Sequence, residues 1–210
     1  MLFSSRTLCK EGTPMDIILA TGNPGKAVQI QTLFGDSPLR VRAADGIHIP
    51  QNVEDGTSEE ENSFKKAHYV QERMPGSWVM ADDTGIYLTA LGGAPGIHAA
   101  RWAGETATAE EIMHYTLSRL ENSTDRSAQF KTAAVLLSPT QERHVFFGEV
   151  PGRILEHPRC APQPGLPYSP IFVPDGEELS WAEMTTEQEN RISHRGIAFR
   201  KVREFLEHRI

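Results

Sequence analysis

Two adjacent carboxylates, Asp82 and Asp83, follow the short apolar run WVMA (78–81) near the middle of the chain. Such a run is typical of a buried strand, and we expect its C-terminal end to present both aspartates. Because successive strand residues point to opposite faces, the two carboxylates are expected to have different roles. One can face a cleft and hold a metal ion or activate water, while the other braces a loop. The alternative is a plain acidic turn.

Small residues follow the two aspartates. Thr84 and Gly85 come first, and the loop GGAPG at 92–96 lies further on. Loops of this composition let the backbone approach a ligand closely.

A second motif lies near the N-terminus, where the apolar run at 16–21 passes into Gly22-Asn23-Pro24-Gly25-Lys26 and then into a helical pattern. A strand, a glycine-bearing turn with a lysine and a helix can cradle a phosphate, because backbone N–H groups at the helix start face the anion. The spacing is not that of a P-loop. A plain β–α turn remains the alternative.

A third motif is the acidic segment at 53–62, which contains Glu54 and Glu61. Thr57 with Glu60, or Ser58 with Glu61, fits a capping box that begins a helix running to about residue 73. The acidic residues also suit the positive end of that helix without any further function. Lys65 and Lys66 follow on the helix, either as solvated charges or as ligand-binding groups.

The remaining pattern alternates strands and helices. We expect a half-buried strand at 39–44, a helix at 108–120, an antiparallel pair at 129–137 and 144–150, a short strand at 171–173 and a closing helix with an apolar face. His194 and Arg195 lie at the start of that last helix, as solvent-facing polar residues or as a ligand clamp.

Composition limits the classes of function. The chain has 210 residues and a net charge of −7, which argues against nucleic acid as the main partner. No apolar run approaches about 18 residues, so no membrane span is expected. Cys9 and Cys160 form no disulfide framework, and a reducing cytoplasm is the simplest compartment. We expect residues 1–14 to be a mobile extension and 15–210 to form one domain of two lobes.

Taken in order, these segments resemble the inosine triphosphate pyrophosphatase family, which hydrolyses non-standard purine nucleoside triphosphates. The matching segments are TGNPGK (21–26), Glu54 with Gly56, Glu61-Asn62 with Lys66, ADDTG (81–85), LGGAPG (91–96), Gly148-Glu149 with Gly152, PIF (170–172) and Ser193-His194-Arg195. They extend from residue 16 to about 206. Each is weak alone, whereas the set in this order is specific.

The resemblance implies an α/β fold with a mixed, elongated central sheet flanked by helices, two lobes around a deep cleft, and a homodimer. It also implies a Mg²⁺-dependent reaction that gives a nucleoside monophosphate and pyrophosphate. By the same resemblance, Asp83 is the general base, Glu54 and Asp83 hold the metal, and Glu61 is a further metal-shell acid or only a helix cap. The resemblance also implies that Lys26 is catalytic. The substrate-binding positions that it implies are Thr21, Gly22, Asn23, Lys26, Lys66, Thr84, Leu166, Tyr168, Ser169, His194 and Arg195.

The chain departs from the family pattern at the base-recognition loop. Members usually carry Gly-Phe-Gly-Tyr-Asp-Pro, where the phenylalanine stacks on the base and the aspartate reads its edge. This chain has GLPYSP at 165–170, so Leu166 lacks an aromatic face, Pro167 removes a donor and Ser169 lacks the charge. Glu189 stands where a lysine is usual and exchanges a phosphate-binding cation for an anion.

These departures leave the preferred base open. The leading hypothesis is hydrolysis of inosine, deoxyinosine or xanthosine triphosphate with altered base selectivity. The alternatives are the same chemistry on another modified nucleotide, or a nucleotide-binding homologue with little turnover. The presence of Asp83, Glu54 and Lys26 favours an enzyme, because a pure binder needs no general base beside a metal.

Overall fold

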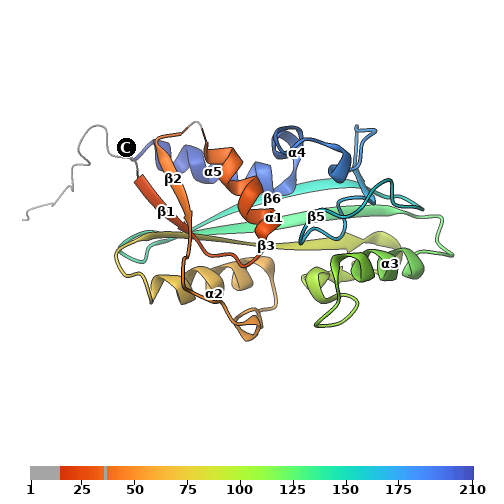
Figure 1. The fold of residues 1–210 in the computed structure, drawn as a ribbon, viewed down its shortest axis with the longest axis horizontal. Coiled ribbons are helices and arrows are strands. Elements are labelled where there is room, and N and C mark those ends of the chain that lie inside the picture. The colour runs from red at the N-terminus through yellow and green to blue at the C-terminus, as the bar shows by residue number, and fades with distance from the viewer. Residues whose placement is uncertain (1–14, 36) are drawn as a thin grey trace, which may run out of the picture.

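The computed structural model describes residues 15–35 and 37–210, so the expected extension at 1–14 lies outside the described residues. Within them the fold is a mixed seven-stranded sheet with helices on both faces (Figure 1). The strand order is β2-β1-β3-β5-β6-β7, and β4 pairs with β3. The predicted α/β class with an elongated mixed sheet is confirmed.

Two groups of elements make up this fold. The strands are β1 (Met15–Leu19), β2 (Leu39–Ala43), β3 (Trp78–Leu88), β4 (Pro95–Gly96), β5 (Ser127–Leu137), β6 (Arg143–Ile154) and β7 (Phe172–Pro174). The α-helices are α1 (Pro24–Phe34), α2 (Glu59–Gln71), α3 (Ala109–Arg119), α4 (Thr186–Ile192) and α5 (His194–Glu207).

The three long strands β3, β5 and β6 form an antiparallel spine, which confirms the predicted pairing of β5 with β6. The expectation that β3 ends after Ala81 is wrong. β5 pairs with β3 from Val79 to Leu88, and these backbone hydrogen bonds keep the chain extended past both aspartates. Asp82 and Asp83 therefore lie within a strand and not in a turn.

The sheet has a gap beside the part of β3 that carries Asp82 and Asp83. β1 runs parallel to β3 but pairs only with Trp78, Val79 and Met80, and β4 pairs with Ile86 and Tyr87. Among the described residues, the strand between these two contacts has no strand partner on that side. Because β1 ends here, the carboxyl end of β1 and the turn after it meet the aspartates at the gap, the usual place for a ligand in an open α/β sheet.

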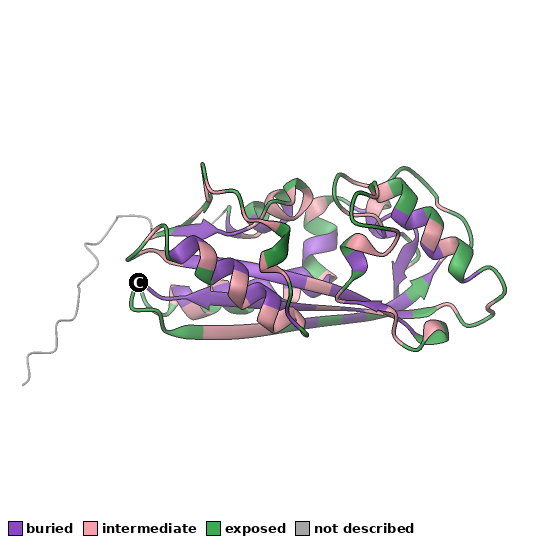
Figure 2. Cartoon of the chain, turned by 90° about the horizontal axis from the view of Figure 1, so that it is seen from below, coloured by how far each residue is buried: buried purple, intermediate pink, exposed green. Residues whose placement is uncertain are grey.

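The helices cover both faces of the spine. In Figure 1, α2 and α3 lie on one side of the long strands, and α1, α4 and α5 lie on the other. Figure 2 shows the buried residues along the strands and on the helix faces turned toward them. Three apolar clusters result: one under α1 and α5, one under α2, and one where α3 meets the far ends of the long strands.

Hydroxyl side chains cap the starts of α2, α3 and α5. The Ser58 hydroxyl accepts from the Glu61 N–H at the start of α2, and the Ser193 hydroxyl accepts from the Gly196 N–H at the start of α5. Thr108 and Glu111 form a reciprocal capping box on α3. In the described part of the chain, no helix has the length and apolarity to cross a membrane.

Candidate active site

A cleft of about 670 Å³ opens at the gap beside β3. Its wall contains every predicted site residue except Glu61: Thr21, Gly22, Asn23, Lys26, Glu54, Lys66, Asp83, Thr84, Leu166, Tyr168, Ser169, His194 and Arg195. These residues come from segments that are far apart in sequence, and the fold brings them to one place.

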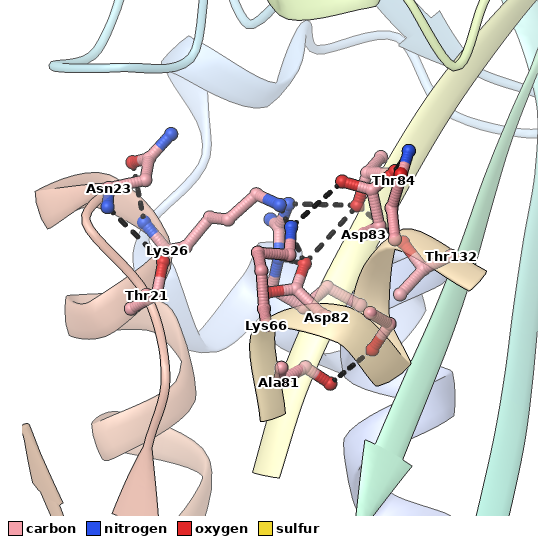
Figure 3. A network of polar contacts seen from close by, with 12 residues as sticks. Thr21, Asn23, Lys26, Lys66, Ala81, Asp82, Asp83, Thr84 and Thr132 are labelled. Carbon is pink, nitrogen blue, oxygen red and sulfur yellow. Dashed lines mark hydrogen bonds and ion pairs between the residues drawn. The ribbon is translucent and has the colours of Figure 1, made fainter. Parts of the chain in front are cut away.

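Asp82 lies behind the cleft wall and compensates two cations. Its Oδ2 is 2.9 Å from the Lys26 Nζ on α1 (Figure 3) and 3.3 Å from the Arg195 Nε on α5. The Asp82 side chain is fully buried. Burial alone would raise its pKa, but Lys26, Arg195 and Lys66 hold the pKa of Asp82 well below its ordinary value. Asp82 is therefore an anion whose role is to keep Lys26 and Arg195 in the interior.

Asp83 faces the opposite side of β3, as expected for successive strand residues. The Lys66 Nζ on α2 donates to its Oδ1 at 2.9 Å (Figure 3), and the Asn62 amide donates to its Oδ2 at 3.3 Å. The Glu54 Oε2 lies 3.5 Å from the same Lys66 ammonium. Two carboxylates thus converge on one lysine at the edge of the cleft.

Burial opposes the charged form of both lysines, but the balance with nearby charges differs. Desolvation opposes the charged form of Lys66, but Asp83 and Glu54 raise its pKa above the ordinary value. For Lys26, desolvation outweighs the attraction of Asp82 and lowers its pKa. Because Lys66 is only 6% exposed, the interpretation of this residue as a solvated surface charge is wrong.

The turn before α1 is tied together by its own side chains. Asn23 caps α1 by accepting from the Lys26 N–H at 3.1 Å, and the Thr21 hydroxyl accepts from the Asn23 N–H at 3.1 Å. The Asn23 amide donates to the Gly165 carbonyl at 2.8 Å, which joins this turn to the loop after β6. A Cβ at Gly25 would overlap the Pro164 carbonyl oxygen, so the close approach of that loop requires glycine here.

His194 and Arg195 are buried, at 3% and 2% exposure, so their interpretation as solvent-facing polar residues is wrong. The His194 ring lies nearly parallel to Phe130 and to Trp181, with centroids 4.6 Å and 4.9 Å away. Burial lowers the pKa of His194 well below its ordinary value, and Arg195 adds to the effect, so the imidazole is neutral. Besides Asp82, Arg195 donates to the Gln29 and Thr84 side chains.

The loop at 165–170 is held by hydrogen bonds of its own side chains. The Ser169 hydroxyl donates to the Leu166 carbonyl at 2.7 Å and accepts from the Gln163 N–H at 3.1 Å. The Tyr168 hydroxyl donates to the Ala99 carbonyl at 2.9 Å, across the cleft floor. The Ser169 hydroxyl therefore bonds within the loop and the Tyr168 hydroxyl ties the loop to the segment at Ala99, while Leu166 and Pro167 line the cleft with apolar surface.

Glu61 lies away from the cleft. Its Oε2 accepts from the Thr57 N–H at 2.9 Å, and its Oε1 is 2.9 Å from the Lys65 Nζ. These bonds lower the pKa of Glu61 to about 2. This is the geometry of the helix-cap alternative, although the backbone donor belongs to Thr57 and not to Ser58.

Several cleft residues were not found from the sequence. Phe130 and Trp181 supply aromatic surface, and Arg101 reaches the Glu54 carbonyl from the other wall. Phe130 carries a weak signal, because it occupies an alternating position in a predicted strand. Trp181 follows an irregular stretch and carries none.

The carboxylates at the cleft edge suit a divalent cation. Mg²⁺ in nucleotide enzymes is bound through one or two carboxylates, with phosphate oxygens and waters completing its shell. Asp83 and Glu54 provide two carboxylates at the cleft edge. Among residues 15–35 and 37–210, no group of three or more His, Cys, Asp or Glu side chains forms a closed site. The residues fit an ion that is shared with a phosphate ligand.

Comparison with known proteins gives one consistent result. The family model described as "Ham1 family" matches residues 17–205. A dITP/XTP pyrophosphatase of Thermoanaerobacter pseudethanolicus is 37% identical over 195 residues, covering 91% of this chain and 96% of that protein. The dITP/XTP pyrophosphatase of Leifsonia xyli is 40% identical over 187 residues, covering 87% and 91%.

Solved structures agree with the sequence relatives. A HAM1 protein from Coxiella burnetii superimposes with a TM-score of 0.79 at 30% identity, covering 92% of this chain and 99% of that one. The Ham1 protein of Staphylococcus aureus gives a TM-score of 0.76 at 32% identity, covering 93% and 100%.

Proposed function

Because the chain belongs to the Ham1 family, we propose that it is a nucleoside triphosphate pyrophosphatase that hydrolyses non-standard purine nucleoside triphosphates. Membership confirms the family resemblance found in the motifs. The relatives described as dITP/XTP pyrophosphatases favour deoxyinosine and xanthosine triphosphates, together with inosine triphosphate, as substrates. The products are a nucleoside monophosphate and pyrophosphate.

One observation carries the proposal: a single cleft joins a carboxylate–lysine cluster to an aromatic recess. Asp83, Lys66 and Glu54 lie at one part of its wall, and Phe130 and Trp181 lie at another. A nucleotide needs both environments, because its phosphates require cations and its base requires flat apolar surface.

Asp83 is the residue best placed to activate water. Its carboxylate lies at the cleft edge, and Lys66 and Asn62 fix its orientation. In the proposed reaction it takes a proton from the water that attacks the α-phosphorus, and pyrophosphate leaves. Lys26 and Arg195 supply positive charge from the other face of β3. Because Asp82 compensates both cations in the interior, they are positioned before substrate binds.

We propose Mg²⁺ as the cofactor, held by Asp83 and Glu54. A bound Mg²⁺ supplies charge neutralisation of the triphosphate and of the leaving pyrophosphate. The Lys66 ammonium, which touches both carboxylates, keeps them together at the cleft edge. The chain's own task is thus to bring two acids and three cations to the phosphates.

Three further expectations are part of this proposal. Residues 15–210 form one domain of two lobes around the cleft, the protein is a homodimer, and it acts in the cytoplasm on the free nucleotide pool. The resemblance supports the dimer, and the two cysteines at positions 9 and 160 are compatible with a reducing compartment.

The test is pyrophosphate release from a panel of inosine, deoxyinosine, xanthosine, guanosine, adenosine and pyrimidine triphosphates, with MgCl₂ and with EDTA. We expect release from the first three, dependent on Mg²⁺. Tight nucleotide binding without pyrophosphate release would instead identify a nucleotide-binding homologue. Release from a different base alone would identify another modified nucleotide as the substrate.

A further inference from the structure

Several buried polar atoms without protein partners belong to residues that line the cleft. In the described part of the chain, the Glu189 Oε2, both His194 ring nitrogens and the Trp181 Nε1 accept or donate no hydrogen bond. All three residues line the cleft, and none is more than 3% exposed. Buried polar groups are almost always bonded, so several such groups lining one cleft indicate a polar ligand.

Glu189 is the acidic residue among these three. It lies on α4, which packs against both α1 and α5. The groups that face it are the Arg195 guanidinium from α5 and the Gln29 amide from α1. Burial raises the pKa of Glu189 to about 7 despite these two groups. Among the described residues, Glu189 forms no ion pair within 4.0 Å, and Arg195 instead pairs with Asp82.

Glu189 is poorly suited to phosphate. A carboxylate this far from water repels an anion strongly, because the low local dielectric leaves the repulsion unscreened. The cations that suit phosphate, Lys26 and Lys66, are held by Asp82 and Asp83 on β3. Glu189 instead lines the same cleft as the neutral His194 and the stacked rings of Trp181 and Phe130. Flat apolar surface of this kind suits a base.

We propose that Glu189 is a specificity-determining residue whose free carboxylate oxygen accepts a hydrogen bond from a ring N–H of the substrate's base. The inference rests on the proposed function and deepens it. A 6-keto purine has such an N–H beside its keto oxygen, whereas adenine has a ring nitrogen lone pair there. A carboxylate attracts the first edge and repels the second. Glu189 thus favours inosine and xanthosine over adenosine nucleotides.

The test compares inosine triphosphate with 1-methylinosine triphosphate, which keeps the keto oxygen and lacks the N1–H. Glu189→Met removes the acceptor at similar size, and Glu189→Gln keeps one acceptor oxygen. Glu187→Gln, at an exposed position of the same helix, is the matched control. Assays at pH 8 measure kcat/KM by pyrophosphate release and Kd by calorimetry, with melting temperatures to verify folding.

We expect Glu189→Met to lower kcat/KM for inosine triphosphate by about 10- to 100-fold, the range for a hydrogen bond to a charged partner. For 1-methylinosine triphosphate, the kcat/KM of Glu189→Met should stay within about threefold of the wild-type value. Glu189→Gln should retain most of its activity on both nucleotides. Equal losses on both nucleotides, or faster hydrolysis of inosine triphosphate by Glu189→Met, would overturn the assignment.

The two proposals fail differently. If the wild-type protein releases no pyrophosphate from any nucleotide, the proposed function is wrong, and the Kd comparison still decides whether Glu189 reads the N1–H. If the wild-type protein hydrolyses inosine triphosphate and Glu189→Met leaves the ratio between the two nucleotides unchanged, only the assignment of Glu189 is wrong.

Discussion

Asp82 and Asp83 are adjacent in β3, yet their carboxylates contact lysines on opposite faces of the sheet. Asp82 is 2.9 Å from Lys26 on α1, and Asp83 is 2.9 Å from Lys66 on α2. The alternation of a strand produces this division. One aspartate becomes a buried counter-ion, and the other stays at the cleft edge, available for water and metal. The gap between β1 and β4 lets both lysines reach the same cleft.

Asp83→Asn tests the base at the cleft edge. The amide keeps the shape of the side chain but cannot take up a proton, so we expect kcat to fall by more than about 100-fold with nucleotide affinity largely retained. Steady-state kinetics and nucleotide titration measure the two quantities. Asp55→Asn, at an exposed site paired with Lys65, is the control. A near-normal rate in Asp83→Asn would move the base elsewhere, with Glu54 next.

Lys26→Met tests the cation on the α1 side. Since this lysine would contact phosphate in both the bound substrate and the transition state, we expect KM to rise and kcat to fall together. Lys65→Met, which breaks exposed pairs with Asp55 and Glu61, should leave both constants nearly unchanged. If Lys26→Met altered only the melting temperature, the turn before α1 would be structural.

Gly148→Ala tests how β6 positions the start of α5. A Cβ at Gly148 would overlap the His194 carbonyl oxygen and lie 2.9 Å from the Ala198 nitrogen. The clash must push α5 away from the sheet, and His194 and Arg195 move with it. We expect a loss of about 2 kcal/mol or more in unfolding free energy, together with lower activity. Chemical denaturation and pyrophosphate release measure both.

The matched control for that substitution is Gly35→Ala. Gly35 has a helical φ of −56°, and a Cβ added there would lie 3.5 Å from its nearest neighbour, the Thr32 carbonyl oxygen. An alanine fits there without strain, so stability should stay the same or rise slightly. Equal stability of Gly148→Ala and wild type would show that α5 and β6 can separate without cost.

Much of this arrangement could be predicted from the sequence. Apolar runs and turn residues indicated most strands and helices, because local patterning sets these elements. The continuation of β3 beyond Ala81 could not be predicted, because its pairing with β5 outweighs the turn tendency of the acidic and glycine-bearing sequence. The burial of Lys66 also depends on partners, Asp83 and Glu54, that only the fold brings near. Motif order gave the cleft residues, whereas Trp181 joins them through the path of an irregular segment.

The buried carboxyl of Glu189 predicts a pH dependence of stability. Its pKa is raised from 4.5 to about 7 in the folded protein, so folding is favoured by protonation and this contribution is lost as the pH rises through 7. Glu189→Gln removes the titration. We expect the variant's stability relative to wild type to increase between pH 5 and pH 8 by on the order of 3 kcal/mol. Urea unfolding at several pH values measures this difference, and parallel curves would contradict it.

The site of water attack tests the central claim most directly. Hydrolysis of inosine triphosphate in ¹⁸O-labelled water with Mg²⁺, followed by mass spectrometry of the products, shows which phosphorus receives the new oxygen. If Asp83 directs water to the α-phosphorus, the label appears in inosine monophosphate, the pyrophosphate stays unlabelled, and Asp83→Asn abolishes both products. Label in orthophosphate or pyrophosphate, with little in the monophosphate, would contradict the account.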